Sequence, residues 1–138
     1  GVTLSAPAGF KVNDVNDVDE AMDYTFRFAT ESPISDVTVD IDSPDYLTKP
    51  NGDSNMLKDV GLDSHFSLVN PGEFDEALSG LGFPTGDEVK GKTALEFVLT
   101  DLIKLLNSDT DSHVHKFTIT IKTDGRPDYV QTLQFRNK

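Results

Sequence analysis

The sequence predicts a mainly β protein, an antiparallel β-sandwich with short helical insertions between its strands. Three observations point to this fold class. At least five segments alternate apolar and polar residues with the period of two that marks a half-buried strand. The segments with helical signals are short, whereas a parallel sheet needs a long crossover between its strands. The length of 138 residues and the hydrophobic share of 36% suit one domain with a single core.

Residues 1–20 are expected to form a polar N-terminal segment, partly loop, ahead of a single domain at residues 21–138. The stretch "NDVNDVDE" within the first twenty residues keeps no regular period. The first strand is predicted in "YTFRFAT", because Tyr24, Phe26 and Phe28 alternate with smaller or charged residues.

A second strand is predicted in "DVTVDID", which directly precedes the turn-rich stretch "SPDYLTKPNGDS". Its apolar side chains share one face, which is expected to point into the core: Val37, Val39 and Ile41. The opposite face is acidic and is expected to be solvated: Asp36, Asp40 and Asp42.

The middle of the chain carries helical signals. "MLKDVGL" can form one helical turn that Gly61 closes, and "NPGEFDEALSG" is predicted to form a longer helix. In the second segment Asn70 is expected as the N-cap, followed by Pro71 at the first helical position. Glu73 fits the carboxylate of a capping box, and Gly80 fits the left-handed position after the last turn.

The last third returns to strand patterns. "ALEFVLT" places Leu95, Phe97 and Leu99 on the inner face, and Thr100 is expected to cap a short helix in "DLIKLLN". The chain then closes with a hairpin, in which "FTITIK" and "YVQTLQF" alternate on either side of the turn signal "TDGRPD".

Composition excludes several kinds of partner. A formal net charge of −12 repels phosphate backbones, so no nucleic-acid partner is expected. The chain has no cysteine, which excludes disulfides and thiolate metal sites. No apolar run approaches the roughly 20 residues that span a bilayer. The composition therefore predicts no membrane-spanning segment.

The octapeptide "GDEVKGKT", Gly86 to Thr93, matches the phosphate-binding pattern G-x-x-x-x-G-K-[ST]. A phosphate loop needs a buried strand before it and a helix after it, so that backbone N–H groups point at the anion. Here "LGFPT" precedes the motif and the strand-like "ALEFVL" follows it. Asp87 and Glu88 would also place two carboxylates in the phosphate cradle. We therefore interpret this motif as a surface loop.

Two clusters contain possible metal ligands, and each has a simpler interpretation. "NDVNDVDEAMD" offers many oxygen ligands for calcium, but the spacing departs from an EF-hand loop and a solvated acidic loop explains it equally. In "DTDSHVH", Asp109 and Asp111 with His113 and His115 could surround a metal in a hydrolase, yet entry of a strand at the sandwich rim explains the same residues. We assign no catalytic, cofactor or metal residue, and an enzyme is not expected.

Glycan binding is the alternative function. Sandwich domains often present aromatic rings that stack on sugar rings. The chain has no tryptophan, but Tyr46 and Tyr129 lie in or beside turns and are candidates for ligand contact. Tyr24 follows a strand pattern and is expected in the core.

The order of segments over residues 57–137 resembles the uncharacterised immunoglobulin-like domains of surface lipoproteins from gut Bacteroidetes, which are related to polycystic-kidney-disease-type modules. The resemblance rests on "GLDSHFSLVNP", "LGFPTGDEVKGKT", "FVLTDLIKLL" and "HKFTITIKTDG", which follow one another as in that family. The turn "KTDGRPDYVQTL" is longer and more polar than the usual one, so Asp124 is given no special role.

The resemblance implies an immunoglobulin-like β-sandwich, export, and a place at the cell envelope or cell surface through a lipidated cysteine upstream. The family's motifs are structural, and no functional residue is carried over. We therefore expect a non-catalytic domain of a lipoprotein, a structural spacer or protein-interaction module whose partner is an envelope protein. The alternative is a glycan-binding or adhesin-like module.

Overall fold

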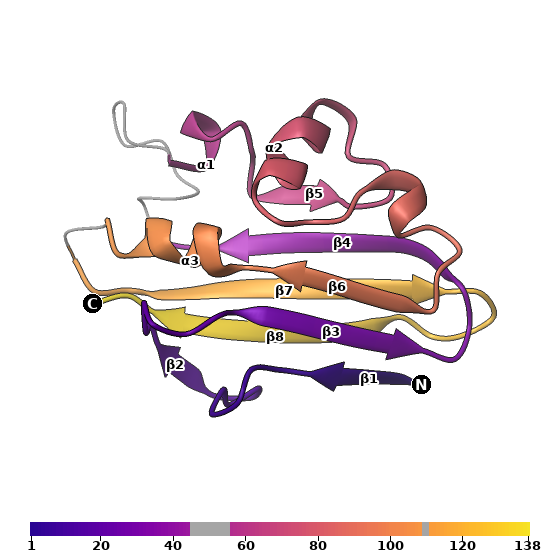
Figure 1. The fold of residues 1–138 in the computed structure, drawn as a ribbon, viewed down its shortest axis with the longest axis horizontal. Coiled ribbons are helices and arrows are strands. Elements are labelled where there is room, and N and C mark those ends of the chain that lie inside the picture. The colour runs from indigo at the N-terminus through magenta and orange to yellow at the C-terminus, as the bar shows by residue number, and fades with distance from the viewer. Residues whose placement is uncertain (45–55, 109–110) are drawn as a thin grey trace.

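The computed structural model describes residues 1–44, 56–108 and 111–138. The protein is mainly β, and its two sheets pack together with the core between them (Figure 1). The predicted class of fold is thus confirmed at this coarse level.

The smaller sheet has three antiparallel strands in the order β1-β3-β6. Their bounds are β1 Val2–Ser5, β3 Thr25–Thr30 and β6 Ala94–Val98. The central strand β3 is the predicted "YTFRFAT" segment, and its Phe26 and Phe28 are buried as expected. Tyr24, which directly precedes β3, is buried too.

The larger sheet has five strands in the order β2-β8-β7-β4-β5. Their bounds are β2 Val15–Asp17, β4 Ile34–Asp42, β5 His65–Ser67, β7 Val114–Thr123 and β8 Tyr129–Arg136. The neighbours pair antiparallel except β2 and β8, which run parallel. The predicted C-terminal hairpin is β7 with β8, and the acidic strand "DVTVDID" lies within β4.

Aromatic side chains from both sheets pack in the core. Phe97 of β6 stacks on Phe28 with ring centroids 5.7 Å apart and on Phe83 at 5.4 Å. From the larger sheet, Phe117 and Phe135 are fully buried and meet edge to face at 5.5 Å. Large rings at alternate strand positions therefore fill the space between the sheets.

The first twenty residues contain more strand than the sequence predicts. β1 and β2 are edge strands, one in each sheet, and the stretch between them includes the expected loop. Val2 and Leu4 of β1 are half-buried against the core. β1 has four residues and β2 has three, so neither is long enough to show a recognisable alternation of apolar and polar residues.

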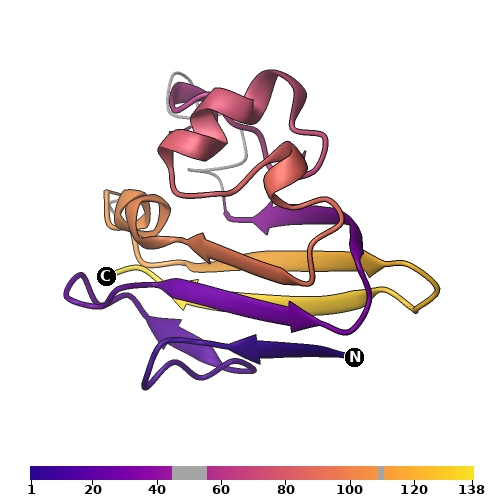
Figure 2. The ribbon, with the colours of Figure 1, turned by 45° about the vertical axis from the view of Figure 1, so that its right-hand side comes forward.

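A helical crossover connects β4 to β6. It contains α1 Met56–Asp59, β5, the 3₁₀ turn η1 Gly72–Phe74, α2 Asp75–Gly80 and the 3₁₀ turn η2 Gly86–Glu88. In both views these helices lie beyond β4 and β5, on the side of the sandwich away from β1 and β2 (Figures 1 and 2). Gly61 has a φ of 86° and ends α1, as predicted.

The predicted caps of the longer helix are wrong. The segment opens with η1, for which Pro71 is the N-cap residue and makes no side-chain capping bond, so Asn70 is not the cap. Gly80 is the last residue of α2 rather than the left-handed residue after it. Gly82, with a φ of 99°, takes the left-handed conformation instead. The segment therefore starts with a 3₁₀ turn, and its left-handed residue comes two positions later than the capping pattern predicts.

α3 spans Thr100–Leu106. Contrary to the prediction, Thr100 is not its N-cap. Its N-cap is Leu99. The Thr100 hydroxyl instead accepts the Tyr24 N–H at 3.0 Å and donates to Asp23 Oδ1 at 3.0 Å. A contact with the start of β3 has therefore taken the side chain away from the helix end.

The two ends of the described chain lie at opposite ends of the long axis. β1 starts at one end, and β8 finishes at the other (Figures 1 and 2). Among the residues that the structure describes, no helix is long and apolar enough to cross a membrane.

Candidate functional site

A pocket of about 200 Å³ opens at the end of the sandwich where β1 starts. It is bounded by Val2 of β1, by Glu31 and Ser32 after β3, and by Thr123 and residues 126–129 at the turn between β7 and β8. β2 pairs with residues 134–136 of β8 and does not extend to this end of the strand. The two sheets are therefore not bridged by β2 here, and the pocket lies between β1 and the start of β8.

Tyr129 is the predicted contact residue that the structure places in this pocket. Its hydroxyl donates to Gln131 Oε1 at 3.2 Å, and its ring meets Phe28 edge-on with centroids 6.1 Å apart. Burial raises the pKa of the Tyr129 hydroxyl, so the phenol stays neutral at physiological pH. The side chain is half-buried, so its ring is part of a pocket wall rather than a freely exposed platform.

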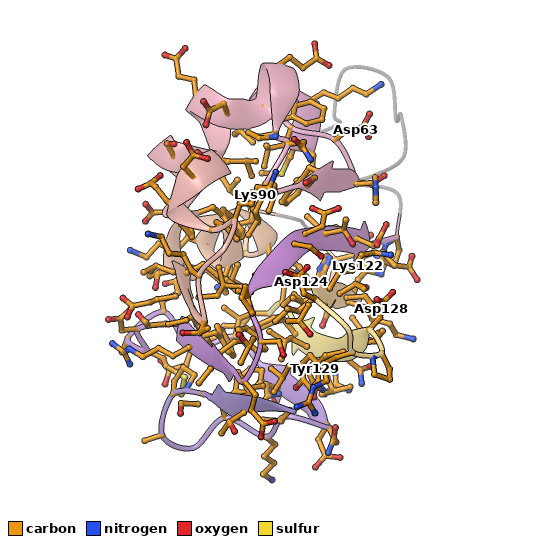
Figure 3. The ribbon with its side chains drawn as sticks, turned by 90° about the vertical axis from the view of Figure 1, so that its right-hand side faces the viewer. Asp63, Lys90, Lys122, Asp124, Asp128 and Tyr129 are labelled. Carbon is orange, nitrogen blue, oxygen red and sulfur yellow. The ribbon has the colours of Figure 1, made fainter. Side chains whose placement is uncertain are left out.

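Charged side chains surround this pocket. Arg126 Nη2 lies 3.2 Å from Glu31 Oε2, and Lys122 Nζ lies 3.2 Å from Asp128 Oδ2. The pKa of Glu31 is lowered, first by a hydrogen bond from the N-terminal ammonium, then by that group's charge and by Arg126. Figure 3 looks onto this end, with Lys122, Asp128 and Tyr129 together near the hairpin turn. Donors and acceptors for a polar ligand thus flank an apolar wall.

The second predicted contact residue, Tyr46, lies outside the described residues. Within the described ranges, Val130 at 58% exposure is the large hydrophobic side chain left exposed. The described part of the chain therefore presents no exposed aromatic platform of the kind expected for sugar stacking.

The octapeptide "GDEVKGKT" directs its amides inward. The N–H of Gly86 donates to Leu68 O at 2.8 Å and that of Gly91 to Ile34 O at 2.7 Å. Val89 and Lys90 both donate to Gly86 O at 3.0 Å. The segment forms η2 and then leads into strand β6, as its surroundings predict. These amides are used within the fold, so they do not form a phosphate cradle.

His115 belongs to the interior. Asn137 Oδ1 accepts the His113 N–H at 2.8 Å, and Asn137 Nδ2 donates to Asp111 O at 2.7 Å, which fixes the amide orientation. Nε2 of His115, 2.9 Å from that Oδ1, must then carry its hydrogen, and Nδ1 accepts from the Ser43 hydroxyl. Both ring nitrogens are therefore occupied within the fold.

Among the described residues, the candidate ligands of the two predicted metal clusters do not converge on one point. Asp109 lies outside the described residues. Near the N-terminus, Asp17 Oδ1 lies 3.3 Å from Arg136 Nη1, and Asp19 Oδ1 accepts the Ala21 N–H at 2.9 Å. Across the described ranges, no three His, Cys, Asp or Glu side chains converge as they would around a metal ion.

Sequence reasoning singled out Tyr129 but none of the other residues of the pocket or of the buried polar network around His115. The pocket depends on the distance between β1 and the hairpin turn, two segments at opposite ends of the chain. The polar network depends on Ser43 and Asn137, which lie 72 and 22 residues from His115. Only the fold brings these groups together, so no local pattern could reveal them.

Comparison with family models, with curated proteins and with solved structures finds no match.

Proposed function

We propose that this chain is a non-catalytic, immunoglobulin-like domain of a cell-envelope lipoprotein, acting as a structural spacer or protein-interaction module. The proposal rests on the positions of the two chain ends. The chain enters at one end of the long axis and leaves at the other (Figure 1). A polypeptide that continued from both ends would gain the length of the sandwich, as a spacer requires.

Strand order supports the immunoglobulin-like part of the proposal. In such domains one sheet contains strands A, B and E, and the other contains G, F and C, with C′ added beside C in variable-type domains. The order β1-β3-β6 corresponds to A-B-E, and β8-β7-β4-β5 corresponds to G-F-C-C′. β2 would be the second part of strand A, transferred to the edge of strand G.

The domain departs from antibody domains in ways its sequence explains. It has no cysteine for an inter-sheet disulfide and no tryptophan to pack against one. The contacts among Phe28, Phe83 and Phe97 occupy the interior instead. The part of the crossover after β5, with η1, α2 and η2, stands where strand D would run, between C′ and E.

Envelope location and a lipid anchor follow from the resemblance of residues 57–137 to surface lipoproteins of gut Bacteroidetes. The acidic outer face of β4 fits a domain that stays dispersed, because Asp40 and Asp42 are exposed. In this proposal the partner is another envelope protein, met through loops or an open sheet edge.

Glycan binding is the second candidate, and the pocket at the start of β1 favours it. A half-buried Tyr129 ring beside Glu31, Arg126 and Asp128 combines an apolar wall with groups that hydrogen-bond hydroxyls. An adhesin-like module would use this pocket, with Tyr129 as its aromatic contact.

Affinity electrophoresis through gels containing plant, mucin and microbial polysaccharides separates the two functions. The spacer proposal predicts unchanged mobility across the panel. Retardation by one polysaccharide that a Tyr46→Ala, Tyr129→Ala double variant abolishes would overturn it in favour of glycan binding. Val130→Ala is the matched control, because Val130 neighbours Tyr129 on β8 but its side chain points to the opposite face.

A further inference from the structure

β1 is an open edge of the three-stranded sheet. β3 lies on one side of it, and within the described residues no strand pairs with its other side. Both ribbon views place β1 at the outer border of the molecule (Figures 1 and 2). Unpaired edges of this kind are templates for adding another strand.

The register identifies which backbone groups face outward. The Thr30 N–H donates to Thr93 O on the β6 side, so the alternate residue Ala29 faces β1, where it opposes Thr3. Thr3 and Ser5 therefore bond to β3. The backbone N–H and C=O groups of Val2 and Leu4 point to the open edge.

β1 lacks the charges that protect edge strands from pairing. Its sequence is "VTLS", whereas the edge strands β2, β5 and β6 contain Asp17, His65 and Glu96. Val2 and Leu4 are also only partly covered, although both pack against the core. An added strand would satisfy the outward backbone groups and cover these two side chains.

We propose that the open edge of β1 pairs antiparallel with β1 of a second copy of this chain. A two-fold axis through Thr3 places Val2 opposite Leu4 of the second copy, and each such pair exchanges both of its N–H···O bonds. Thr3 then lies directly opposite Thr3. The strand is self-complementary in this register because its outward groups lie symmetrically about Thr3.

The pocket at the start of β1 fits the same pairing. Val2 lines this pocket, and Leu4 of the second copy projects from the same face of the joined sheet, next to Val2. That leucine side chain is thus brought to the pocket mouth. The contact is small, and each copy carries a net charge of −12, so the pairing is weak and strengthens as salt screens the repulsion.

Disulfide trapping tests this register directly, since the chain contains no cysteine of its own. Residues opposite each other at a non-hydrogen-bonded position have Cα atoms about 4.5 Å apart, within the range that a disulfide bridges. Thr3→Cys is therefore expected to give a covalent dimer under mild oxidation. Ser5→Cys is the matched control, because Ser5 is also exposed but lies opposite residue 1 of the second copy.

The proposal predicts that the Thr3→Cys dimer forms at least about tenfold faster than the Ser5→Cys dimer, since pairing raises the effective thiol concentration. Adding Val2→Pro to Thr3→Cys removes an outward N–H and is expected to abolish the advantage, whereas Val2→Ala retains that N–H and much of the advantage. Equal rates for the two cysteine variants would refute the pairing. The spacer proposal does not depend on this outcome, because it concerns the two chain ends and not the β1 edge.

Discussion

At the residue scale, a buried polar network closes the end of the sandwich where β8 finishes. Ser43, His115 and Asn137 are each at most 1% exposed and satisfy one another's hydrogen bonds. Leaving a buried donor without an acceptor costs more free energy than the hydrogen bond contributes when both partners are present. Asn137 therefore matters most, because its Oδ1 serves both His113 N–H and His115 Nε2–H.

Asn137→Ala is expected to lower the free energy of unfolding by about 2–4 kcal/mol, because the buried His115 Nε2–H and the part-buried His113 N–H both lose their acceptor. Urea denaturation followed by circular dichroism measures the change. Asn13→Ala is the control, since Asn13 is exposed and its side-chain contact with Gln131 is long, at 3.5 Å. Equal effects of the two substitutions would show that the network contributes nothing beyond a surface contact.

Tyr129 gives a prediction for alkaline pH. Burial raises its pKa, so the folded state holds the phenolic proton more tightly than the unfolded state, whose tyrosine pKa is about 10. The resulting stability is fully present below that pKa and is lost as the pH rises through the higher, folded value. Tyr129→Phe cannot ionise, so its stability should fall less than that of the original chain between pH 8 and pH 11.

Urea denaturation at the two pH values measures this difference. The lost hydrogen bond to Gln131 affects the variant at both pH values and cancels in the comparison. An identical loss of stability in both proteins would mean that the Tyr129 hydroxyl titrates alike in the folded and unfolded states.

At the element scale, glycine placement determines how the crossover returns to β6. Gly82 has a φ of 99°, and a Cβ added there would lie 2.9 Å from Val98 O. Its own carbonyl accepts the Val98 N–H at 3.2 Å, which joins the segment after α2 to the end of β6. Gly80, two residues earlier, has helical geometry and open space around it.

Gly82→Ala is expected to destabilise the fold by about 2 kcal/mol or more, because it combines a left-handed backbone with a close approach to Val98 O. Gly80→Ala should be neutral or stabilise by about 0.5–1 kcal/mol, since alanine suits a helix better. Thermal unfolding of the pair distinguishes them. A larger loss for Gly80→Ala would reverse the assignment of the left-handed residue.

The elements differ in how far the sequence specifies them. Strands β3, β4, β6, β7 and β8 follow from alternation, because each buries one face over five residues or more. β1, β2 and β5 have only three or four residues and depend on pairing with a distant strand. The predictions of the helix caps were wrong for a similar reason. The Thr100 side chain bonds to Tyr24 and Asp23 instead of capping α3, and a 3₁₀ turn precedes α2.

At the scale of the whole molecule, the parallel pairing of β2 with β8 distributes the N-terminal segment between both sheets. The chain therefore begins at one end of the sandwich and finishes at the other (Figure 1). No local pattern predicts this arrangement, because it depends on which distant edges the short strands β1 and β2 join. The spacer proposal depends on it entirely.

Small-angle X-ray scattering of a chain carrying two copies joined end to end tests the spacer proposal most directly. Because each copy is entered and left at opposite ends, we expect a maximum dimension close to twice that of the single domain. Scattering from the single domain at the same protein concentration and salt provides the reference length. A maximum dimension near that of two domains lying side by side would contradict the proposal.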